Sequence, residues 1–320
     1  MTYSPREVVA AATAAANRIN DLIERTPLDH SAEFSELSGA DVYLKRENRQ
    51  TTGSFKLRGA SNRLATLTDE QRARGCVAAS SGNHGAAVAC AMQRLDVSGV
   101  IFVPEQTSTA KVDAIRGYGG NVQFFGTDGL DTEQHARTYA IENDMFYLSP
   151  YNDPEVIAGQ GTCGIEIQEQ LPDVNAVFIA VGGGGLAAGV ASVLKAGNPE
   201  VVVYGCQPEA SAVMAKSIEA GEILDLPSAP TLSDGTAGGI EAEALTFELC
   251  RTLIDESVLV SEKEIAAAMR IYLDAEKEPL EGAAGVALAG LLKRKNAIRG
   301  RKVTVIVCGG NVSQEVLDGI

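Results

Sequence analysis

The 320-residue sequence is short of the residues that metal sites and nucleic-acid-binding surfaces need. It has only three histidines (His30, His84 and His135), and its six scattered cysteines form no C-x-x-C pair or other short metal-ligand spacing. The 42 acidic residues outnumber the 27 basic ones, and the resulting net charge of −15 argues against a nucleic-acid partner. We therefore expect no metal site, reduced thiols and no binding to nucleic acid.

The sequence also lacks segments that would direct the chain to a membrane. Residues 1–7 contain no basic region followed by an apolar core, which a secretory signal would require. No uninterrupted apolar run approaches the roughly 18 residues of a membrane span. We find no tandem repeat or low-complexity tail, and we expect no appended regulatory domain after Ile320. These absences predict a cytoplasmic protein with no membrane partner.

Short β-branched runs alternate with longer helical periods, which is typical of an α/β fold with parallel sheets. The length favours two lobes. The predicted strands are 75–79, 98–103, 121–125, 176–181, 201–207 and 302–308, and the predicted helices include 86–95, 110–118, 134–143 and 186–196. We expect one parallel-sheet unit in about 71–147 and another from about 148 onward. The turn-rich segment 147–162 is interpreted as the crossing between lobes, and 221–240 as a long loop beside an active-site mouth.

One lysine, Lys56, lies behind a small flexible turn in the segment 52–60, TGSFKLRGA. Lysine forms Schiff bases only as the neutral amine, so a reactive lysine needs partial burial to lower its pKa from about 10.4. Gly53 and Ser54 allow a tight turn, and Phe55 supplies an apolar flank. Taken alone, Lys56 is better explained as a surface residue that opens a helix.

Four consecutive glycines, Gly182, Gly183, Gly184 and Gly185, separate the apolar run 177–181 from the predicted helix 186–196. This arrangement favours phosphate binding, because glycines let an anion approach the backbone and a helix N-terminus attracts its charge. The helix dipole contributes only about 0.3–2 kcal/mol, so N–H hydrogen bonds must supply most of the affinity. The spacing is not G-x-G-x-x-G and no Walker lysine follows, so a structural glycine turn is the alternative.

Two further segments carry polar groups where predicted strands end. The segment Ser80 to Gly85 can hold a carboxylate with its N–H groups and hydroxyls, and the amide of Asn83 can hydrogen-bond a phenolic oxygen. Ser and Asn are also common helix N-caps, and His84 is either an orienting residue or a filler. The thiol of Cys308 could bond a pyridine nitrogen or simply be buried. Together the four segments describe a site for a phosphate-bearing aldehyde cofactor.

In this order and spacing, the four segments resemble those of fold-type II pyridoxal-phosphate enzymes of the threonine/serine dehydratase and serine racemase family. The resemblance extends over nearly the whole chain and includes 43–48 (YLKREN), 157–162 (IAGQGT) and 280–285 (LEGAAG). It implies an α/β fold with two lobes, like the tryptophan synthase β subunit, each a mostly parallel twisted sheet flanked by helices. Residues 1–70 and 148–320 would form a large cofactor-binding domain, and 71–147 a small mobile one.

The resemblance also implies a role for each matching residue. Lys56 would hold pyridoxal 5'-phosphate as a Schiff base, with Phe55 beside the ring, Asn83 at the phenolic oxygen and Cys308 at the pyridine nitrogen. Gly182 to Gly185 and Leu186 would bind the phosphate, and Glu281 would lie near the ring. Ser81 would lie opposite the lysine as a second acid/base. The substrate-binding residues would be Ser80, Ser81, Gly82, Asn83 and His84.

A neutral thiol at Cys308 would stabilise a protonated ring less than a carboxylate would, which disfavours a long-lived carbanion. Lys56 can remove the Cα proton while a β-hydroxyl leaves, so we expect β-elimination that gives a 2-oxo acid and ammonia.

Two differences from the pattern of the family restrict the metals and substrates that we expect. Gln207 and Val213 stand where relatives that bind a divalent cation present carboxylates, and we expect no metal even though Glu209 is nearby. Thr132 stands where some relatives place an arginine, which makes hydroxyaspartate less attractive as a substrate.

We therefore expect a pyridoxal-phosphate-dependent ammonia-lyase (dehydratase) of amino-acid catabolism that acts on an L-β-hydroxy-amino acid such as threonine or serine. The family resemblance implies a homodimer. The alternatives are a serine or hydroxyaspartate racemase, and a dehydratase of a hydroxyectoine-derived or other 3-hydroxy amino acid, whose sequences the segment 234–239 (DGTAGG) resembles. A β-replacement synthase and a non-catalytic cofactor-binding protein are the remaining possibilities.

Overall fold

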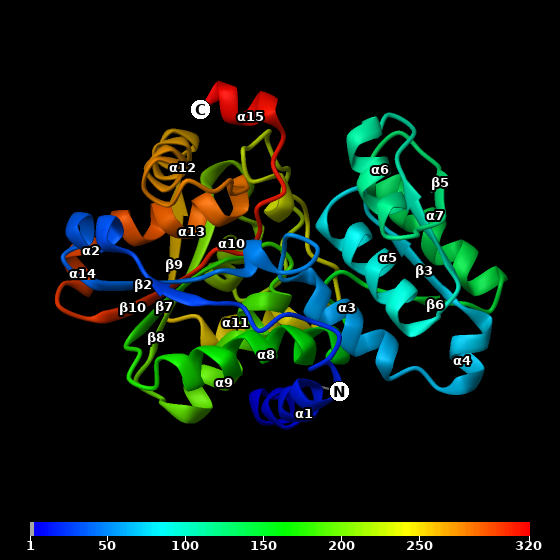
Figure 1. The fold of residues 1–320 in the computed structure, drawn as a ribbon, viewed down its shortest axis with the longest axis horizontal. Coiled ribbons are helices and arrows are strands. Elements are labelled where there is room, and N and C mark those ends of the chain that lie inside the picture. Colours follow the sequence, from blue (N-terminus) through cyan, green and yellow to red (C-terminus); the bar gives the residue numbers. More distant parts are fainter. Residues whose placement is uncertain (1–2) are drawn as a thin grey trace.

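The computed structural model describes residues 3–320 and has the expected α/β architecture, with two sheets side by side (Figure 1). The larger sheet has the strand order β1-β2-β10-β7-β8-β9, and every neighbouring pair in it is parallel except β1 and β2. Its strands are β1 (Leu28–His30), β2 (Asp41–Lys45), β7 (Ala176–Ala180), β8 (Val202–Pro208), β9 (Glu256–Val260) and β10 (Lys302–Ile306).

The smaller sheet is wholly parallel, with the order β5-β4-β3-β6. Its strands are β3 (Cys76–Ala79), β4 (Gly99–Val103), β5 (Val122–Phe124) and β6 (Phe146–Tyr147). Alternate residues of β3 and β4 face opposite sides, so Ala78 and Ile101 pack towards α5 (Asn83–Leu95), whereas Val77 and Val100 pack towards α7 (Gly129–Glu142).

Helices cover both faces of each sheet, as a parallel sheet requires (Figure 1). The larger sheet lies between α13 (Gly282–Lys293) and the layer of α8 (Pro154–Gln170) and α9 (Gly185–Gly197), and α3 (Lys56–Ala65) contacts both α8 and α5. The remaining helices are α1 (Pro5–Arg18), α2 (Ala32–Ser38), α4 (Asp69–Arg74), α6 (Thr109–Gly117), α10 (Val213–Ala220), α11 (Leu245–Leu253), α12 (Glu262–Glu276), α14 (Lys295–Ile298) and α15 (Gln314–Gly319). The short 3-10 helices are η1 (Glu47–Arg49), η2 (Glu209–Ser211) and η3 (Asp234–Thr236).

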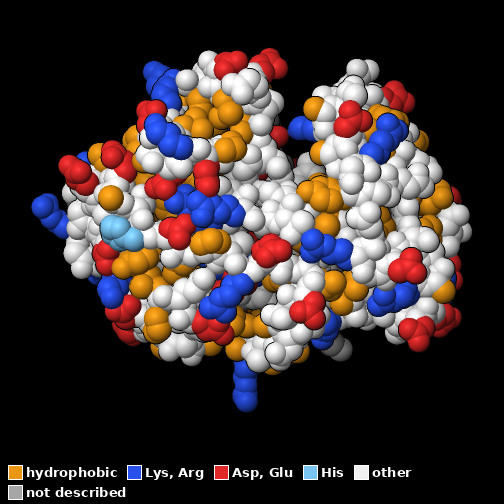
Figure 2. Space-filling model, in the orientation of Figure 1, with side chains coloured by type: hydrophobic (Ala, Val, Ile, Leu, Met, Phe, Trp, Pro, Cys, Tyr) orange, Lys and Arg blue, Asp and Glu red, His pale blue; other side chains and the backbone are white. Residues whose placement is uncertain are grey.

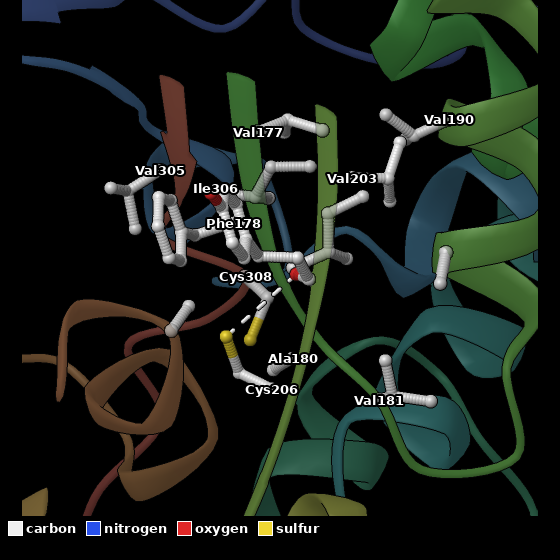
Figure 3. Close-up of a cluster of buried hydrophobic side chains, with 14 of the residues drawn as sticks. Val177, Phe178, Ala180, Val181, Val190, Val203, Cys206, Val305, Ile306 and Cys308 are labelled. Atoms are coloured by element: carbon white, nitrogen blue, oxygen red, sulfur yellow. Dashed lines mark hydrogen bonds between the residues drawn. The ribbon is translucent and has the colours of Figure 1, made fainter. Parts of the chain in front are cut away.

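The centre of the larger sheet is apolar on both faces, as its continuous apolar sequence predicts. All five residues of β7 are buried, and the Phe178 ring is stacked on the Tyr204 ring with centroids 4.4 Å apart. Figure 3 shows Val177, Phe178 and Ala180 of β7 together with Cys206 and Cys308 in this core. Burial of this core fixes the carboxyl ends of β7 and β10, from which the next segments enter the site. Among residues 3–320, no helix has the length and apolar character needed to cross a membrane.

The six predicted strands are all present, and each end lies within two residues of its prediction. The short strands β1, β2, β6 and β9 were not predicted. The prediction of a turn-rich crossing over 147–162 is wrong beyond residue 153, because α8 begins at Pro154 with Asp153 as its N-cap. Helices α5 and α7 begin three and five residues before their predicted starts, at Asn83 and Gly129.

The glycines of α8 that suggested turns serve close helix packing instead. A Cβ on Gly159 would lie 2.6 Å from the carbonyl oxygen of Arg58 in α3, and one on Gly161 would lie 2.8 Å from the Cβ of Ala12 in α1. The division of the chain into domains at residues 70 and 148 remains a prediction, although all four strands of the smaller sheet lie between its boundaries.

Candidate active site

A cleft of about 1970 Å³ lies between the two sheets, and the space-filling view shows the molecule hollowed there (Figure 2). Segments that follow the carboxyl ends of β3, β7 and β10 line it, together with the segment that carries Lys56. This is the edge at which open parallel sheets place ligands. Part of the long loop 221–240 also lines the cleft, as predicted.

Lys56 is the first residue of α3, and backbone contacts with the end of β10 fix its position. The N–H of Phe55 donates to the carbonyl of Cys308 at 3.0 Å, and Ser54 forms a β-bridge with Gly309. The Nζ of Lys56 donates to the carbonyl of Pro150 at 2.9 Å. Burial lowers the pKa of Lys56 to about 8, with the nearby Cys308 and Glu281 opposing the shift. The structure therefore gives this lysine the low pKa that a Schiff-base amine needs.

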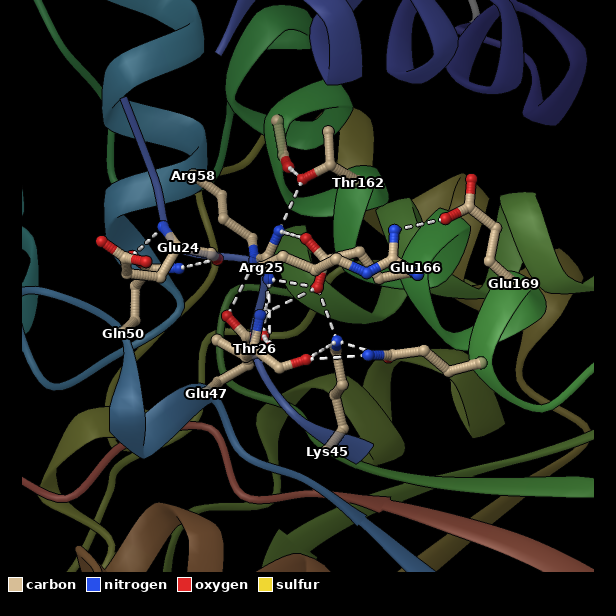
Figure 4. Close-up of polar contacts among 12 residues, drawn as sticks. Glu24, Arg25, Thr26, Lys45, Glu47, Gln50, Arg58, Thr162, Glu166 and Glu169 are labelled. Carbon is tan, nitrogen blue, oxygen red and sulfur yellow. Dashed lines mark hydrogen bonds and ion pairs between the residues drawn. The ribbon is translucent and has the colours of Figure 1, made fainter. Parts of the chain in front are cut away.

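A buried ionic network that the sequence reasoning missed surrounds Arg58, two residues beyond Lys56 in the chain (Figure 4). The guanidinium of Arg58 pairs with Glu47 at 2.8 Å and with Glu166 at 2.7 Å, and Glu166 also accepts from Lys45 at 2.5 Å. Burial opposes ionisation of Glu47, but Arg58 brings the pKa of Glu47 below its usual value. The network joins α3 to β2, η1 and α8 at a point two residues beyond Lys56.

The four glycines connect β7 to α9, and their N–H groups face no protein acceptor. Within residues 3–320, no hydrogen-bond acceptor pairs with the N–H groups of Gly182 to Leu186. Gly184 has a φ of +87°, and a Cβ on Gly183 would lie 2.5 Å from the Tyr151 ring. The loop therefore presents consecutive free donors at a helix N-terminus, which suits a phosphate.

Asn83 lies in a chain of hydrogen bonds at the centre of the cleft. Its Nδ2 donates to Oε2 of Glu281 at 2.7 Å, and its Oδ1 accepts from Nδ2 of Asn311 at 2.7 Å. The thiol of Cys308 donates a long contact of 3.8 Å to Oε1 of Glu281. Burial raises the pKa of Glu281 to about 7 and that of Cys308 well above its usual value. The structure thus brings Asn83, Glu281 and Cys308 together, and it adds Asn311, which the sequence reasoning did not single out.

The segment Ser80 to His84 lines the cleft from the side of the smaller sheet. Ser80 Oγ accepts from the N–H of Gly82 at 3.2 Å, and Ser81 and Gly82 are open to the cavity. His84 is buried, with its Nε2 3.0 Å from the carbonyl of Leu148, and burial lowers the pKa of His84 to about 3. A neutral imidazole that donates from Nε2 has only the acceptor Nδ1 left, so the side chain of His84 has no free N–H for a carboxylate and only its backbone N–H could donate to one.

Thr132 lies in the first turn of α7. Its hydroxyl donates to the carbonyls of Phe125 and Asp128, at 2.8 and 2.6 Å. Arg137, which the sequence reasoning missed, lines the cleft as Thr132 does, with its guanidinium stacked over the Tyr147 ring and paired with Glu241 at 3.1 Å. Gln207 stands where metal-binding relatives are expected to have a carboxylate, and its amide oxygen accepts from the N–H of Ala215 at 2.6 Å. Among residues 3–320, no three His, Cys, Asp or Glu side chains are grouped to hold a metal.

The residues present fit pyridoxal phosphate. The row of unpartnered N–H groups after β7 suits its phosphate, and the amine of Lys56, with its lowered pKa, suits its aldehyde. Both line the same cleft. The contacts of Asn83 and Cys308 with the ring remain predictions.

Comparison with known proteins agrees with this geometry. Residues 19–309 match the family described as pyridoxal-phosphate dependent enzyme. The chain is 40% identical over 306 residues to the L-threonine ammonia-lyase of Thermotoga maritima, an alignment that covers 96% of this chain and 76% of the relative. Threonine deaminase isoform 2 of Solanum lycopersicum superposes with a TM-score of 0.94 at 35% identity, over 99% of this chain and 93% of that one. Maize serine racemase superposes with a TM-score of 0.92 at 32% identity, over 97% and 95% of the two chains.

Proposed function

The chain belongs to the family of pyridoxal-phosphate-dependent enzymes, and we propose that it is an ammonia-lyase that eliminates the β-hydroxyl of an L-β-hydroxy-amino acid such as threonine or serine. The products are a 2-oxo acid and ammonia. The main support is the combination of a lysine of lowered pKa and a row of free N–H groups in a chain about 40% identical to an L-threonine ammonia-lyase.

In this proposal, residues that follow strands of both sheets contribute to the site. Bound pyridoxal phosphate supplies an electron-withdrawing ring that stabilises negative charge at the substrate Cα. Lys56 would hold the cofactor before the substrate binds and, once the substrate amine has replaced it, would take the proton from Cα as a free neutral amine. Gly182 to Gly185 and Leu186 bind the phosphate, Phe55 flanks the ring, and Asn83 and Cys308 contact it.

The remaining residues bind the substrate carboxylate and exchange a proton near the cofactor ring. Ser80, Ser81, Gly82, Asn83 and His84 form the substrate-carboxylate side of the cleft, with N–H and hydroxyl donors supplying most of the contacts. Glu281 takes up or releases a proton near the ring, since its pKa of about 7 allows both states near neutral pH.

A racemase is the second candidate, because Ser81 is open to the cleft and maize serine racemase has the same fold at 32% identity. Racemisation needs a second acid/base on the face of the substrate opposite the lysine, and Ser81 is the predicted group. Both activities use Lys56, so the reaction products must separate them.

The deciding experiment measures 2-oxo acid, ammonia and D-amino acid after incubation of the purified protein with a substrate panel. The panel contains L-serine, L-threonine, threo- and erythro-3-hydroxyaspartate, phenylserine and a hydroxyectoine-derived amino acid. We expect equimolar 2-oxo acid and ammonia, with L-threonine or L-serine preferred. D-serine formation that exceeds elimination would establish the racemase instead, and no product from any substrate would refute both.

We also propose that the protein is a cytoplasmic homodimer and that residues 71–147 move as a small domain. The family resemblance supports the homodimer and the movement of the small domain. Sedimentation equilibrium tests the dimer, and small-angle scattering with and without substrate tests the movement. A monomer, or a scattering profile unchanged by saturating substrate, would contradict the corresponding proposal.

A further inference from the structure

Helix α11 contacts the glycine loop from the side opposite the cleft. The hydroxyl of Thr246 donates to the carbonyl of Gly183 at 2.6 Å, and the thiol of Cys250 lies 3.7 Å from the carbonyl of Gly184. Both side chains are fully buried. Neither of them lines the cleft, although the glycines that they contact do.

These two contacts fix the direction of the loop's N–H groups. In a trans peptide the C=O and the N–H that share one plane point in opposite directions. When Thr246 holds the carbonyl of Gly183 towards α11, the N–H of Gly184 must point away from α11, into the cleft. The carbonyl of Gly184, held by Cys250 and by the N–H of Ala188 at 2.8 Å, fixes the N–H of Gly185 in the same way.

We propose that Thr246 and Cys250 are positioning residues that orient the N–H groups of the glycine loop towards the cofactor phosphate. The inference rests on the proposed binding of the phosphate by Gly182 to Leu186. The two residues act through the backbone and touch no reacting atom.

Close packing supports this assignment independently of the hydrogen bonds. A Cβ on Gly184 would lie 2.8 Å from Sγ of Cys250 and 3.1 Å from Cβ of Thr246, and Gly184 also has a φ of +87°. The glycine at this position therefore accommodates α11 as well as the turn. On another side of the loop the Tyr151 ring approaches Gly183, so protein atoms hold the loop from two directions.

The start of α11 is itself held against the segment that carries Tyr151. Oδ1 of Asn152 accepts from the N–H of Leu245 at 2.9 Å, and the hydroxyl of Tyr151 accepts from the N–H of Glu241 at 2.9 Å. These bonds fix the position of Thr246 next to the loop. The short O–H bond of Thr246 contributes more than the long S–H contact of Cys250, because thiols are weak donors.

The test compares two ligands that differ only in the phosphate. Cofactor-free full-length protein is titrated with pyridoxal phosphate and with pyridoxal, and uptake is followed by absorbance. The variant Thr246→Val removes the hydroxyl at nearly constant volume, and Thr246→Ser restores it. Thr252→Val is the matched control, because Thr252 lies on the same helix and its hydroxyl donates to the carbonyl of Glu248 on the exposed surface.

We expect Thr246→Val to weaken pyridoxal phosphate binding by about 10-fold, the effect of a lost buried hydrogen bond. Pyridoxal affinity should change less than about twofold, and Thr246→Ser and Thr252→Val should bind both ligands like the parent protein. Cys250→Ala should weaken pyridoxal phosphate binding by a smaller factor of about 3. Cys250→Ala provides a second measurement of pyridoxal phosphate affinity if Thr246→Val folds poorly.

Equal losses for both ligands would overturn the inference, because they would show general damage rather than a role at the phosphate. Unchanged pyridoxal phosphate affinity in both Thr246→Val and Cys250→Ala would overturn it as well, while the proposed function would stand. A parent protein that bound pyridoxal and pyridoxal phosphate equally would show that the glycine loop holds no phosphate, and both proposals would then fall.

Discussion

Nδ2 of Asn83 donates a 2.7 Å hydrogen bond to Oε2 of Glu281, which joins the first turn of α5 to the residue that precedes α13. The bond crosses the cleft from the smaller sheet's layer to the larger one's. Glu281 is only 6% exposed, so little water reaches its carboxylate, and a negative charge on it is poorly solvated. The proton on Glu281 therefore affects both the site and the stability of the chain.

The first prediction is that Glu281 makes stability depend on pH near neutrality. Burial raises its pKa from 4.5 to about 7, so the folded state binds the proton more tightly than the unfolded state. This stabilisation is complete below about pH 4.5 and is lost as the pH rises through about 7. Between pH 5 and 8, the free energy of unfolding should fall by about 2.5 kcal/mol more in the parent protein than in Glu281→Gln.

Urea unfolding of cofactor-free protein at several pH values measures this difference. Glu219→Gln serves as the control, because its carboxylate is exposed. The same pH slope in Glu281→Gln and in the parent protein would contradict the prediction.

The second prediction concerns the ionisation of Lys56. With a pKa of about 8, about one amine in ten is neutral at pH 7, whereas the fraction for a lysine of pKa 10.5 is roughly one in 3000. Competitive acetylation of cofactor-free protein, read by mass spectrometry, should therefore give Lys56 a reactivity that rises with pH and levels off above about pH 8. A Lys56 reactivity that still increases tenfold per unit above pH 9 would rule out the lowered pKa.

The third prediction separates two lysines of the same cleft. Lys56→Ala should lower turnover by at least about 10³-fold, because it removes the amine that takes the Cα proton in the proposed reaction. Lys111 lines the cleft but pairs with Asp234 at 3.6 Å near the surface, so Lys111→Ala should retain turnover within about threefold. Full turnover in Lys56→Ala would overturn the assignment of function.

The fourth prediction compares two glutamates of α8 drawn in Figure 4. Glu166 joins the buried network of Arg58 and Lys45, and Glu169 pairs with Arg25 on the surface at 2.5 Å. Glu166→Gln should lower the free energy of unfolding by about 3–5 kcal/mol, since it leaves buried charges uncompensated. Glu169→Gln should change it by less than about 1 kcal/mol in the same denaturant titration. Similar losses in the two variants would show that burial does not set the strength of this network.

The parts of the site that the sequence predicts are those whose chemistry is local. Lys56 behind a glycine-containing turn and four glycines between a strand and a helix carry their signal within a few neighbouring residues. The structure places both in one cleft, because β7 and β10 are adjacent and end at the same edge of the sheet. The order of these segments in the chain and the adjacency of β7 and β10 are therefore enough to explain why Lys56 and the glycine loop meet.

The parts that sequence reasoning missed depend on contacts between distant segments. The glycines of α8 look like turn residues until α1 and α3 are seen packed against them. Thr246 resembles any helix threonine, and its importance depends on the Gly183 carbonyl 63 positions earlier. Strand β2 carries Lys45 at a buried position, which an apolar pattern cannot reveal without the partner Glu166.

The unpartnered N–H groups of Gly182 to Leu186 have a consequence for the supply of enzyme in the cell. Donors without protein acceptors must be hydrated until an anion binds, so the newly made chain remains less stable than the chain with its cofactor. The amount of protein in the cell would then depend on the supply of cofactor as well as on synthesis, because quality-control proteases remove the molecules that unfold most often. A row of backbone amides would in this way couple the abundance of the enzyme to the supply of its cofactor.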